Sequence, residues 1–430
     1  MGDFKAFYCA GNVVLHGHDP YAAGPLGACE ALKTYSWMAS GTQGATLPAP
    51  LPGYEIAFFV PFALLSYSQA VLVWSIISLA ALVFSIILFA RCGVGPWPVI
   101  LVAFSLMVAG ISIAVGELPP LALAGLAIAA AGVQSKRVWM AVIGLTLTMA
   151  EPQIGLLVGV ALAALSRRYL WSVAGTFVAL VIISLLTLGF SENVEYAVTV
   201  LPAHILAELP SVLQYGGSWV VQRLGAPDTI AVLVGRITYG IAIVGTFLFA
   251  RTARARENPV LPVLAAAVFA VVSGPFVHLD HIALAIPAAL WLTSVANPLR
   301  NWQIAAAVAL TIPPLYIFAH PLLYIFVPLI TVWIIIGFGG SSIVAIRGAL
   351  VSSLVILAIG FVVVHTGTGN VVVSSAQHQS TLAQDSWGTW VRHRFVMLSW
   401  SIFLVKAPTW FGMLMTAGTA ICGRLCARVS

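Results

Sequence analysis

Charged residues are scarce in this sequence. The chain of 430 residues has 19 basic and 13 acidic residues, which together make 7% of it, while 61% of the residues are hydrophobic. A soluble globular protein carries about 25% charged residues. This shortage excludes a soluble enzyme, a disordered chain and a nucleic-acid-binding protein. It predicts a polytopic membrane protein.

The sequence also lacks the alternation of apolar and polar residues that marks a membrane β-barrel. Most of its apolar stretches have the length of a membrane-spanning helix, about 16 to 25 residues. We therefore predict an all-α polytopic membrane protein, a bundle of about 11–13 transmembrane helices. A re-entrant hairpin over 138–166, broken at Pro152, is an alternative to two short full spans. The predicted spans are 69–90, 98–115, 118–133, 138–149, 152–166, 170–189, 229–250, 259–277, 282–296, 303–318, 322–337, 342–365 and 396–423.

Cysteine is rare as well. Five cysteines, one of them Cys92, are too few for a disulfide framework. Cys422 and Cys426 lie on one helical face and are expected to be buried thiols. Cys9 and Cys29 share one predicted external loop. Because disulfides persist in oxidising compartments, a single disulfide between these two cysteines is an alternative to free thiols.

The basic residues orient the predicted spans. Twelve of the 19 fall in one set of alternating loops, and the positive-inside rule makes these loops cytoplasmic. They are Arg91, Lys136, Arg137, Arg167, Arg168, Arg251, Arg254, Arg256, Arg300, Arg347, Arg424 and Arg428.

The acidic residues show the opposite distribution. All except Glu257, together with the nine histidines, fall on or near the external side. Avoidance of the positive side explains acids in surface loops. It does not explain Glu117, Glu151 and Asp280, which lie in very short turns between apolar helices. Because charge close to lipid is costly and usually functional, we expect a site at this face.

The whole chain, 1–430, is predicted to form a single membrane domain. Residues 1–57 form a long first external loop, and 58–365 form the helical core, with an external segment at 190–228. Residues 366–430 hold a further external segment and the last transmembrane helix. The chain enters an external loop directly after Met1, with no signal peptide before it. Either the N-terminal tail is translocated unaided, or a first transmembrane helix is missing before residue 1, and we favour the second.

Six segments follow one another in an order that resembles glycosyltransferase family 87, one of the GT-C glycosyltransferases. The resemblance runs from residue 3 to about 290 and leaves the last 140 residues unmatched. Family members commonly have Gln where this chain has Glu117 and Lys where it has Glu151. The segments are DFKAFYCAGNVVLHGHDPY, PLPGYEIAFFVPFALLSYSQAVLVW, VGELPPLALAGLAI, EPQIGLLVGVALAALSRRYLW, QYGGSWVVQRLG and GPFVHLDHIALAIPA.

The resemblance implies a membrane glycosyltransferase that uses a polyprenyl-phosphate-linked sugar, most commonly mannose, and a lipid or glycan acceptor. It implies a site facing the exterior of a bacterial plasma membrane, among membrane lipids. Such a reaction needs a base for the acceptor hydroxyl and donor groups for the leaving phosphate. The base of GT-C enzymes is an acid of the first external loop, which corresponds to Asp3. Neighbouring aromatics, Phe4, Phe7 and Tyr8, would desolvate it.

Further polar residues are candidates for binding the donor or the acceptor. Asp19 precedes Pro20 and is expected chiefly to shape its loop. Arg236 lies inside an apolar span, where it could snorkel or bind a lipid phosphate. The predicted binding residues are Lys5, Tyr8, Asp19, Tyr21, Glu117, Glu151, Gln153, Arg236, His278, Asp280 and His281.

No cofactor is expected, although a divalent metal is left open. The turn with His278, Asp280 and His281 has metal-ligand side chains, but neighbours in a tight turn rarely converge on one ion. Two other functions remain as alternatives. A secondary transporter would also have broken helices and buried charges. A non-catalytic scaffold or lipid-flipping protein is the third.

Overall fold

The structure is a computed structural model, and it confirms the all-α membrane fold. Among the described residues the only strand-like features are two isolated β-bridges, Ala22 with Leu382 and Gln214 with His278. The described residues are 2–31, 46–105, 111–252, 255, 257–294, 299–312, 382–394 and 401–422, without the side chains of His393, Arg394 and Ser401. Outside them lie the predicted spans 322–337 and 342–365, parts of 98–115, 282–296, 303–318 and 396–423, and Cys426, Arg254, Arg256, Arg347, Arg424 and Arg428.

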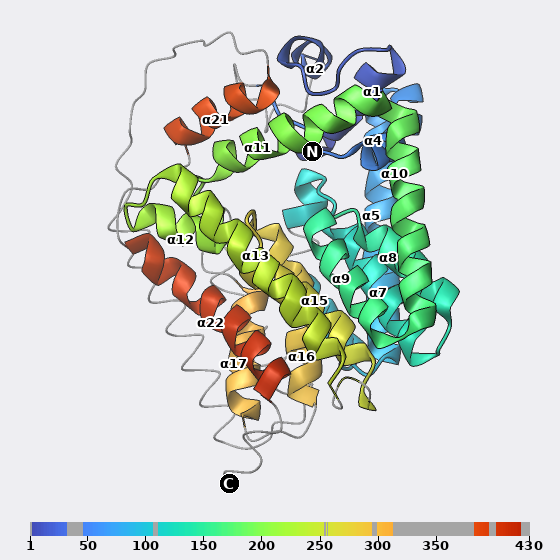
Figure 1. The fold of residues 1–430 in the computed structure, drawn as a ribbon, viewed down its shortest axis with the longest axis vertical. Coiled ribbons are helices and arrows are strands. Elements are labelled where there is room, and N and C mark those ends of the chain that lie inside the picture. Colours follow the sequence, from blue (N-terminus) through green and yellow to red (C-terminus); the bar gives the residue numbers. More distant parts are fainter. Residues whose placement is uncertain are drawn as a thin grey trace.

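The helices follow one another without any sheet (Figure 1). They are α1 (Gly2–Leu15), α2 (Ala23–Glu30), α4 (Gly53–Phe59), η1 (Val60–Leu64), α5 (Tyr67–Arg91), α6 (Trp97–Phe104), α7 (Pro119–Gln134), α8 (Val138–Thr148), α9 (Pro152–Leu165), α10 (Arg167–Glu195), η3 (Tyr196–Val200), α11 (Leu201–Glu208), α12 (Gly217–Arg223), α13 (Asp228–Ala250), α15 (Val260–Ser273), η4 (Asp280–Ala285), α16 (Ile286–Ser294), α17 (Arg300–Thr311), α21 (Ala383–Arg394) and α22 (Ser401–Cys422).

Among the described residues, three helices are long and apolar enough to cross a membrane: α5, the continuous helix from Arg167 to Glu208, and α13. Large apolar side chains such as Leu72, Leu186 and Leu248 stay exposed on them. Extended apolar surfaces of this kind are suited to contact with lipid. The shorter helices α7 and α15 are buried on almost every side, so they form the interior of the bundle.

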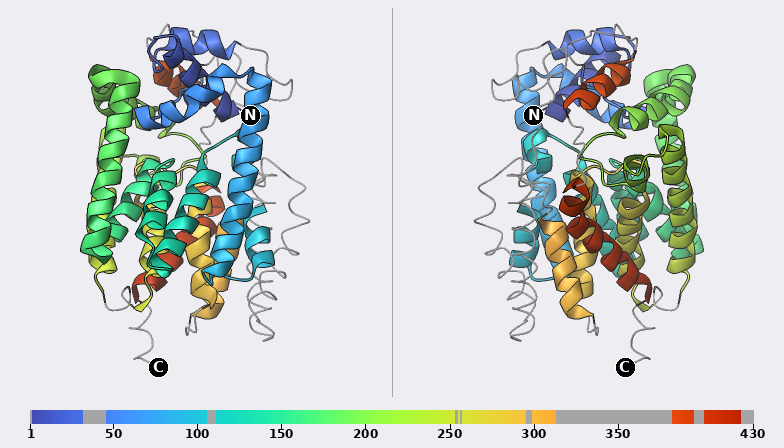
Figure 2. Two further views of the ribbon diagram at one scale, coloured as in Figure 1. Left: turned by 90° about the vertical axis from the view of Figure 1, so that its right-hand side faces the viewer. Right: turned by 90° about the vertical axis from the view of Figure 1, so that its left-hand side faces the viewer.

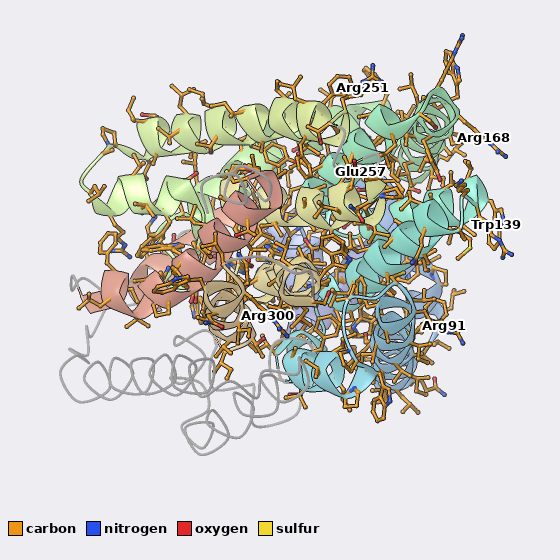
Figure 3. All side chains as sticks on the ribbon, turned by 90° about the horizontal axis from the view of Figure 1, so that it is seen from below. Arg91, Trp139, Arg168, Arg251, Glu257 and Arg300 are labelled. Atoms are coloured by element: carbon orange, nitrogen blue, oxygen red, sulfur yellow. A yellow bond between two sulfur atoms is a disulfide. The ribbon has the colours of Figure 1, made fainter. Side chains whose placement is uncertain are left out.

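The two ends of the bundle differ in charge. Figure 3 views the molecule from below Figure 1 and shows Arg91, Arg168, Arg251 and Arg300 at this end. Figures 1 and 2 show α1, α2, α11 and α21 together at the other end, and we call these four helices the cap. The structure therefore gathers loops of the basic set at one end, as the topology prediction requires.

Two segments predicted as external loops are largely helical. Residues 1–57 contain α1, α2 and α4 rather than one long loop. Residues 190–208 continue α10 through η3 into α11, beyond a kink at Gly189, whose φ is 80° and ψ is −178°. Residues with a Cβ atom rarely adopt this backbone conformation. The kink turns the helix across the end of the bundle opposite the basic loops, where it becomes part of the cap (Figure 1).

The predicted hairpin over 138–166 consists of two short helices, α8 and α9. At about 1.5 Å per residue neither crosses a hydrocarbon core about 30 Å thick. Helix α8 packs closely on α7. A Cβ atom added to Gly144 would lie only 2.3 Å from the backbone nitrogen of Ala129, so a larger residue does not fit there. This close approach brings the turn at Glu151 towards Glu117, which directly precedes α7.

Helix α1 is anchored through Phe4. This ring is fully buried, stacks on Trp74 of α5 at 5.4 Å between ring centroids, and meets Phe59 and Phe62 edge-on. Burial of an aromatic side chain contributes about 2–3 kcal/mol relative to exposure. The neighbouring Asp3 therefore starts from a rigid support.

Cys9 and Cys29 form a disulfide between α1 and α2. The bond closes a loop with a sequence separation of 20 residues. It ties together two helices of the cap, and it lies at the end of the molecule opposite the basic loops. Since disulfides persist in oxidising compartments, the bond supports an external position for the cap.

We expect reduction of this disulfide to lower stability. Loop-closure entropy for about 20 residues predicts a loss of about 3 kcal/mol in the free energy of unfolding. Thermal unfolding of the purified protein with and without dithiothreitol measures it. The double variant Cys9→Ser/Cys29→Ser is the control, because dithiothreitol should not lower its melting temperature further. An unchanged melting temperature of the reduced wild type would contradict a stabilising bond.

Candidate active site

A cavity of about 810 Å³ lies between the cap and the bundle. This volume is within the range of small-molecule sites, about 300–1,000 Å³. Apolar residues make up most of its wall, and none of the described residues that line it is a lysine or an arginine. The polar side chains that line it are Asp3, Glu55, Glu117, Glu151, Glu208, Asp280, His204, His278, His281, Gln153, Tyr196, Tyr239 and Trp387.

The carboxyl groups of Asp3 and Glu117 lie close enough to share a hydrogen bond. Two carboxyl groups can form such a bond only if one of them keeps its proton. Trp74 contacts the residue next to each member of this pair. Its ring stacks on Phe4, and its indole N–H donates to the carbonyl of Gly116 at 3.1 Å. The pair is thus built by α1, α5 and the turn before α7.

Burial raises the pKa of Asp3 to about 6, although the hydrogen bond from Glu117 acts in the opposite direction. Burial, and after it the negative charge of Asp3, raise the pKa of Glu117 well above its ordinary value. At neutral pH the pair therefore holds one proton, on Glu117, which donates it to the Asp3 carboxylate. Asp3 is then a carboxylate with a pKa close to the working pH, which suits a general base.

Glu151, Gln153 and His281 meet at the turn between α8 and α9. His281 Nε2 lies 2.9 Å from Glu151 Oε2, and His281 Nδ1 accepts the backbone N–H of His278 at 2.9 Å. Gln153 Nε2 lies 3.5 Å from the same Nδ1, and the backbone carbonyl of Gln153 accepts a hydrogen bond from the Tyr239 hydroxyl at 2.5 Å. The turn is therefore held in place from both η4 and α13.

These contacts indicate which ring nitrogen of His281 carries a proton. Burial lowers the pKa of its ring, but the charges of Glu151 and Asp280 outweigh burial and raise it to about 9, which favours a doubly protonated ring. The hydrogen bond at Nδ1 opposes this, because a second proton there would face the N–H of His278. The geometry therefore places one proton on Nε2, which donates to Glu151.

Glu151, Asp280 and His281 bring their ligand atoms within 4.8 Å of one another, which is close enough to consider a metal ion. A metal bound at His281 Nε2 requires the ring proton on Nδ1. That position already accepts the His278 N–H. In this arrangement the group offers two carboxylates and no imidazole, so it lacks the nitrogen ligand that a zinc site prefers.

His278 lies on the other side of the same turn. Its Nε2 is 3.0 Å from Glu208 Oε2, and its ring stacks on Phe276 at 4.7 Å between ring centroids. Glu208 also accepts the indole N–H of Trp387. Three distant parts of the chain, namely α11, the turn before η4 and α21, thus meet at one edge of the cavity.

Seven of the predicted site residues line the cavity together: Asp3, Glu117, Glu151, Gln153, His278, Asp280 and His281. The other five do not line it. Tyr8, Asp19 and Tyr21 bind other parts of the cap region, with Tyr8 donating to Leu65 O, Asp19 accepting Tyr21 N–H and Tyr21 donating to Leu51 O. Lys5 is half-buried near Glu30. Arg236 is exposed on α13.

Six polar cavity residues were not predicted from the sequence: Glu55, Tyr196, His204, Glu208, Tyr239 and Trp387. His204 and Glu208 are spaced four apart, so a helical reading of 190–228 would have placed them on one face. Glu55 lies in the first turn of the apolar helix α4. Among the described residues its buried Oε1 has no hydrogen-bond partner, and the same holds for Nδ1 of His204. For Trp387 no local signal distinguishes a cavity residue from an interfacial one.

Comparison with known proteins gives one match. The family model of glycosyltransferase family 87 matches residues 54–278, which are 225 of the 430 residues and just over half of the chain. The matched part includes Glu117, Glu151 and His278, and it leaves out Asp3 and Trp387. None of the curated proteins and none of the solved structures compared with the chain matches it.

Proposed function

The chain belongs to glycosyltransferase family 87, and we propose that it transfers a sugar, mannose or a similar hexose, from a polyprenyl-phosphate donor to a hydroxyl group of a lipid or glycan acceptor. The observation that carries the proposal is the Asp3–Glu117 pair at the cavity wall. Family membership favours this enzyme over a secondary transporter and over a non-catalytic scaffold.

In the proposed reaction the Asp3 carboxylate takes the proton of the acceptor hydroxyl. The acceptor oxygen forms a bond to the anomeric carbon of the sugar, and the bond from that carbon to the phosphate oxygen breaks. Its electron pair leaves with the polyprenyl phosphate. Glu117 keeps the base in position through their hydrogen bond. We propose that Glu151, Gln153, Asp280 and His281 bind sugar hydroxyls.

We propose that the cavity faces the exterior of a bacterial plasma membrane. Two observations support this orientation. The disulfide between Cys9 and Cys29 lies in the cap, and the basic residues Arg91, Arg168 and Arg251 lie at the opposite end. A donor carried by a lipid suits a site at the external end, because soluble nucleotide sugars are confined to the cytoplasm.

The donor is tested with purified protein in lipid nanodiscs. We expect label to pass from polyprenyl-phosphate-[³H]mannose into an acceptor lipid fraction, and none to pass from GDP-[³H]mannose. We also expect no metal requirement, so the rate should be the same in EDTA. Transfer from GDP-mannose alone would contradict the lipid donor. Loss of transfer in EDTA, restored by Mn²⁺, would contradict a metal-independent reaction.

A further inference from the structure

Helix α21 reaches the cavity from the part of the chain that follows the family match. It packs on α11, and the backbone N–H of Ala383 donates to Tyr21 O at 3.2 Å. Trp387 lines the cavity, stacks on Trp390 at 4.5 Å between ring centroids, and donates its indole N–H to Glu208 Oε1. A side chain outside the matched residues thus binds one inside them.

Both oxygens of Glu208 are engaged. Oε1 accepts from Trp387, and Oε2 lies 3.0 Å from His278 Nε2. The residue is 3% exposed, so loss of either partner would leave a carboxylate oxygen with little access to water. Hydrogen bonds to a charged group contribute about 1.5–3 kcal/mol each. Two such bonds hold the carboxylate in one orientation.

His278 is held on several sides. Its ring stacks on Phe276, and its Nε2 is bound by Glu208. The preceding residue, Val277, donates its N–H to Gln214 Oε1 at 3.0 Å and accepts from Tyr215 N at 2.7 Å. The side chain is 21% exposed and lines the cavity. In the described part of the structure Nδ1 has no hydrogen-bond partner, so it is the ring nitrogen left for a ligand.

The charges around His278 favour a positively charged ring. Glu208 and His204 face it from α11, Asp3 from α1, Asp280 and His281 from η4. Burial lowers the pKa of His278, but the charge and hydrogen bond of Glu208 outweigh burial and raise it above the ordinary value. Since no lysine or arginine is among the described cavity residues, His278 is their best candidate for a cation.

We propose that Glu208 and Trp387 are positioning residues that hold the His278 ring with Nδ1 towards the cavity, where its N–H donates to the phosphate of the donor. This inference rests on the proposed function, because that function supplies the phosphate. Trp387 acts through Glu208, and Glu208 acts through His278. Neither touches the phosphate. The helix α21 would then complete a phosphate site whose other parts lie within the family match.

The test measures binding of farnesyl phosphate to the protein in nanodiscs between pH 6 and 9. Wild-type affinity should fall as pH rises and His278 loses its proton. In Glu208→Gln the carboxylate charge is gone, so the fall should occur at a pH at least one unit lower. Trp387→Phe keeps an aromatic ring without the N–H, and its affinity should fall about tenfold, the effect of one hydrogen bond to a charged group.

Trp410→Phe is the matched control, because its indole N–H donates to Tyr215 O at 3.1 Å and it does not line the cavity. Its affinity and pH dependence should equal those of the wild type. Wild-type affinity and pH dependence in Glu208→Gln would overturn the inference, even if Trp387→Phe fails to fold. A wild type that neither binds farnesyl phosphate nor transfers sugar would instead overturn the proposed function and remove the phosphate from the site.

Discussion

Asp3→Asn should lower the rate of sugar transfer by about 10³-fold. A positioned general base contributes about 10²- to 10⁴-fold, and the amide cannot accept the proton of the acceptor hydroxyl. The substitution keeps the size of the side chain, so Phe4 should stay packed on Trp74. Steady-state transfer from polyprenyl-phosphate-mannose measures the effect, and the melting temperature shows whether the variant is folded.

The wild type should also show the titration of Asp3. Only the carboxylate accepts a proton, so the rate should fall as pH drops through about 6, the pKa of Asp3, and level off above it. Asp19→Asn is the matched control. Asp19 lies in the same N-terminal region outside the cavity lining, and its Oδ1, retained in the amide, accepts Tyr21 N–H at 2.9 Å. Full activity of Asp3→Asn would remove Asp3 as the base.

Glu117→Gln and Glu117→Ala should differ widely. The glutamine amide can donate to the Asp3 carboxylate as the protonated Glu117 does, so we expect its activity to stay within about threefold of the wild type. Alanine removes the donor, and the loss of one hydrogen bond to a charged group predicts a fall of about 10- to 100-fold. Transfer rates between pH 5 and 8 measure both variants.

The pH profile separates positioning from direct binding. In Glu117→Gln the acid limb near pH 6 should remain, because Asp3 still titrates and still has a hydrogen-bond donor. Equal losses in the two variants would show that the carboxyl group itself is needed, for instance as an acceptor for a sugar hydroxyl. Gln is also the residue that family members commonly have at this position, so the expected tolerance agrees with the resemblance.

The membrane class of the protein could be predicted from the sequence, because it follows from local composition. A chain with 7% charge can bury its apolar stretches only in a membrane. The turns at Glu117, Glu151 and His278 also stood out, since a polar residue between two apolar helices is visible without any knowledge of packing. All three turns line the cavity.

Which of these side chains contact one another could not be predicted in this way. Glu208 and Trp387 are 179 residues apart, and only the packing of α21 on α11 brings the indole to the carboxylate. The same holds for Asp3 and Glu117, which meet because Phe4 stacks on a tryptophan that also binds Gly116. A pKa depends on burial and on neighbouring charges, so composition marks the acids, while the tertiary structure decides which of them keeps its proton.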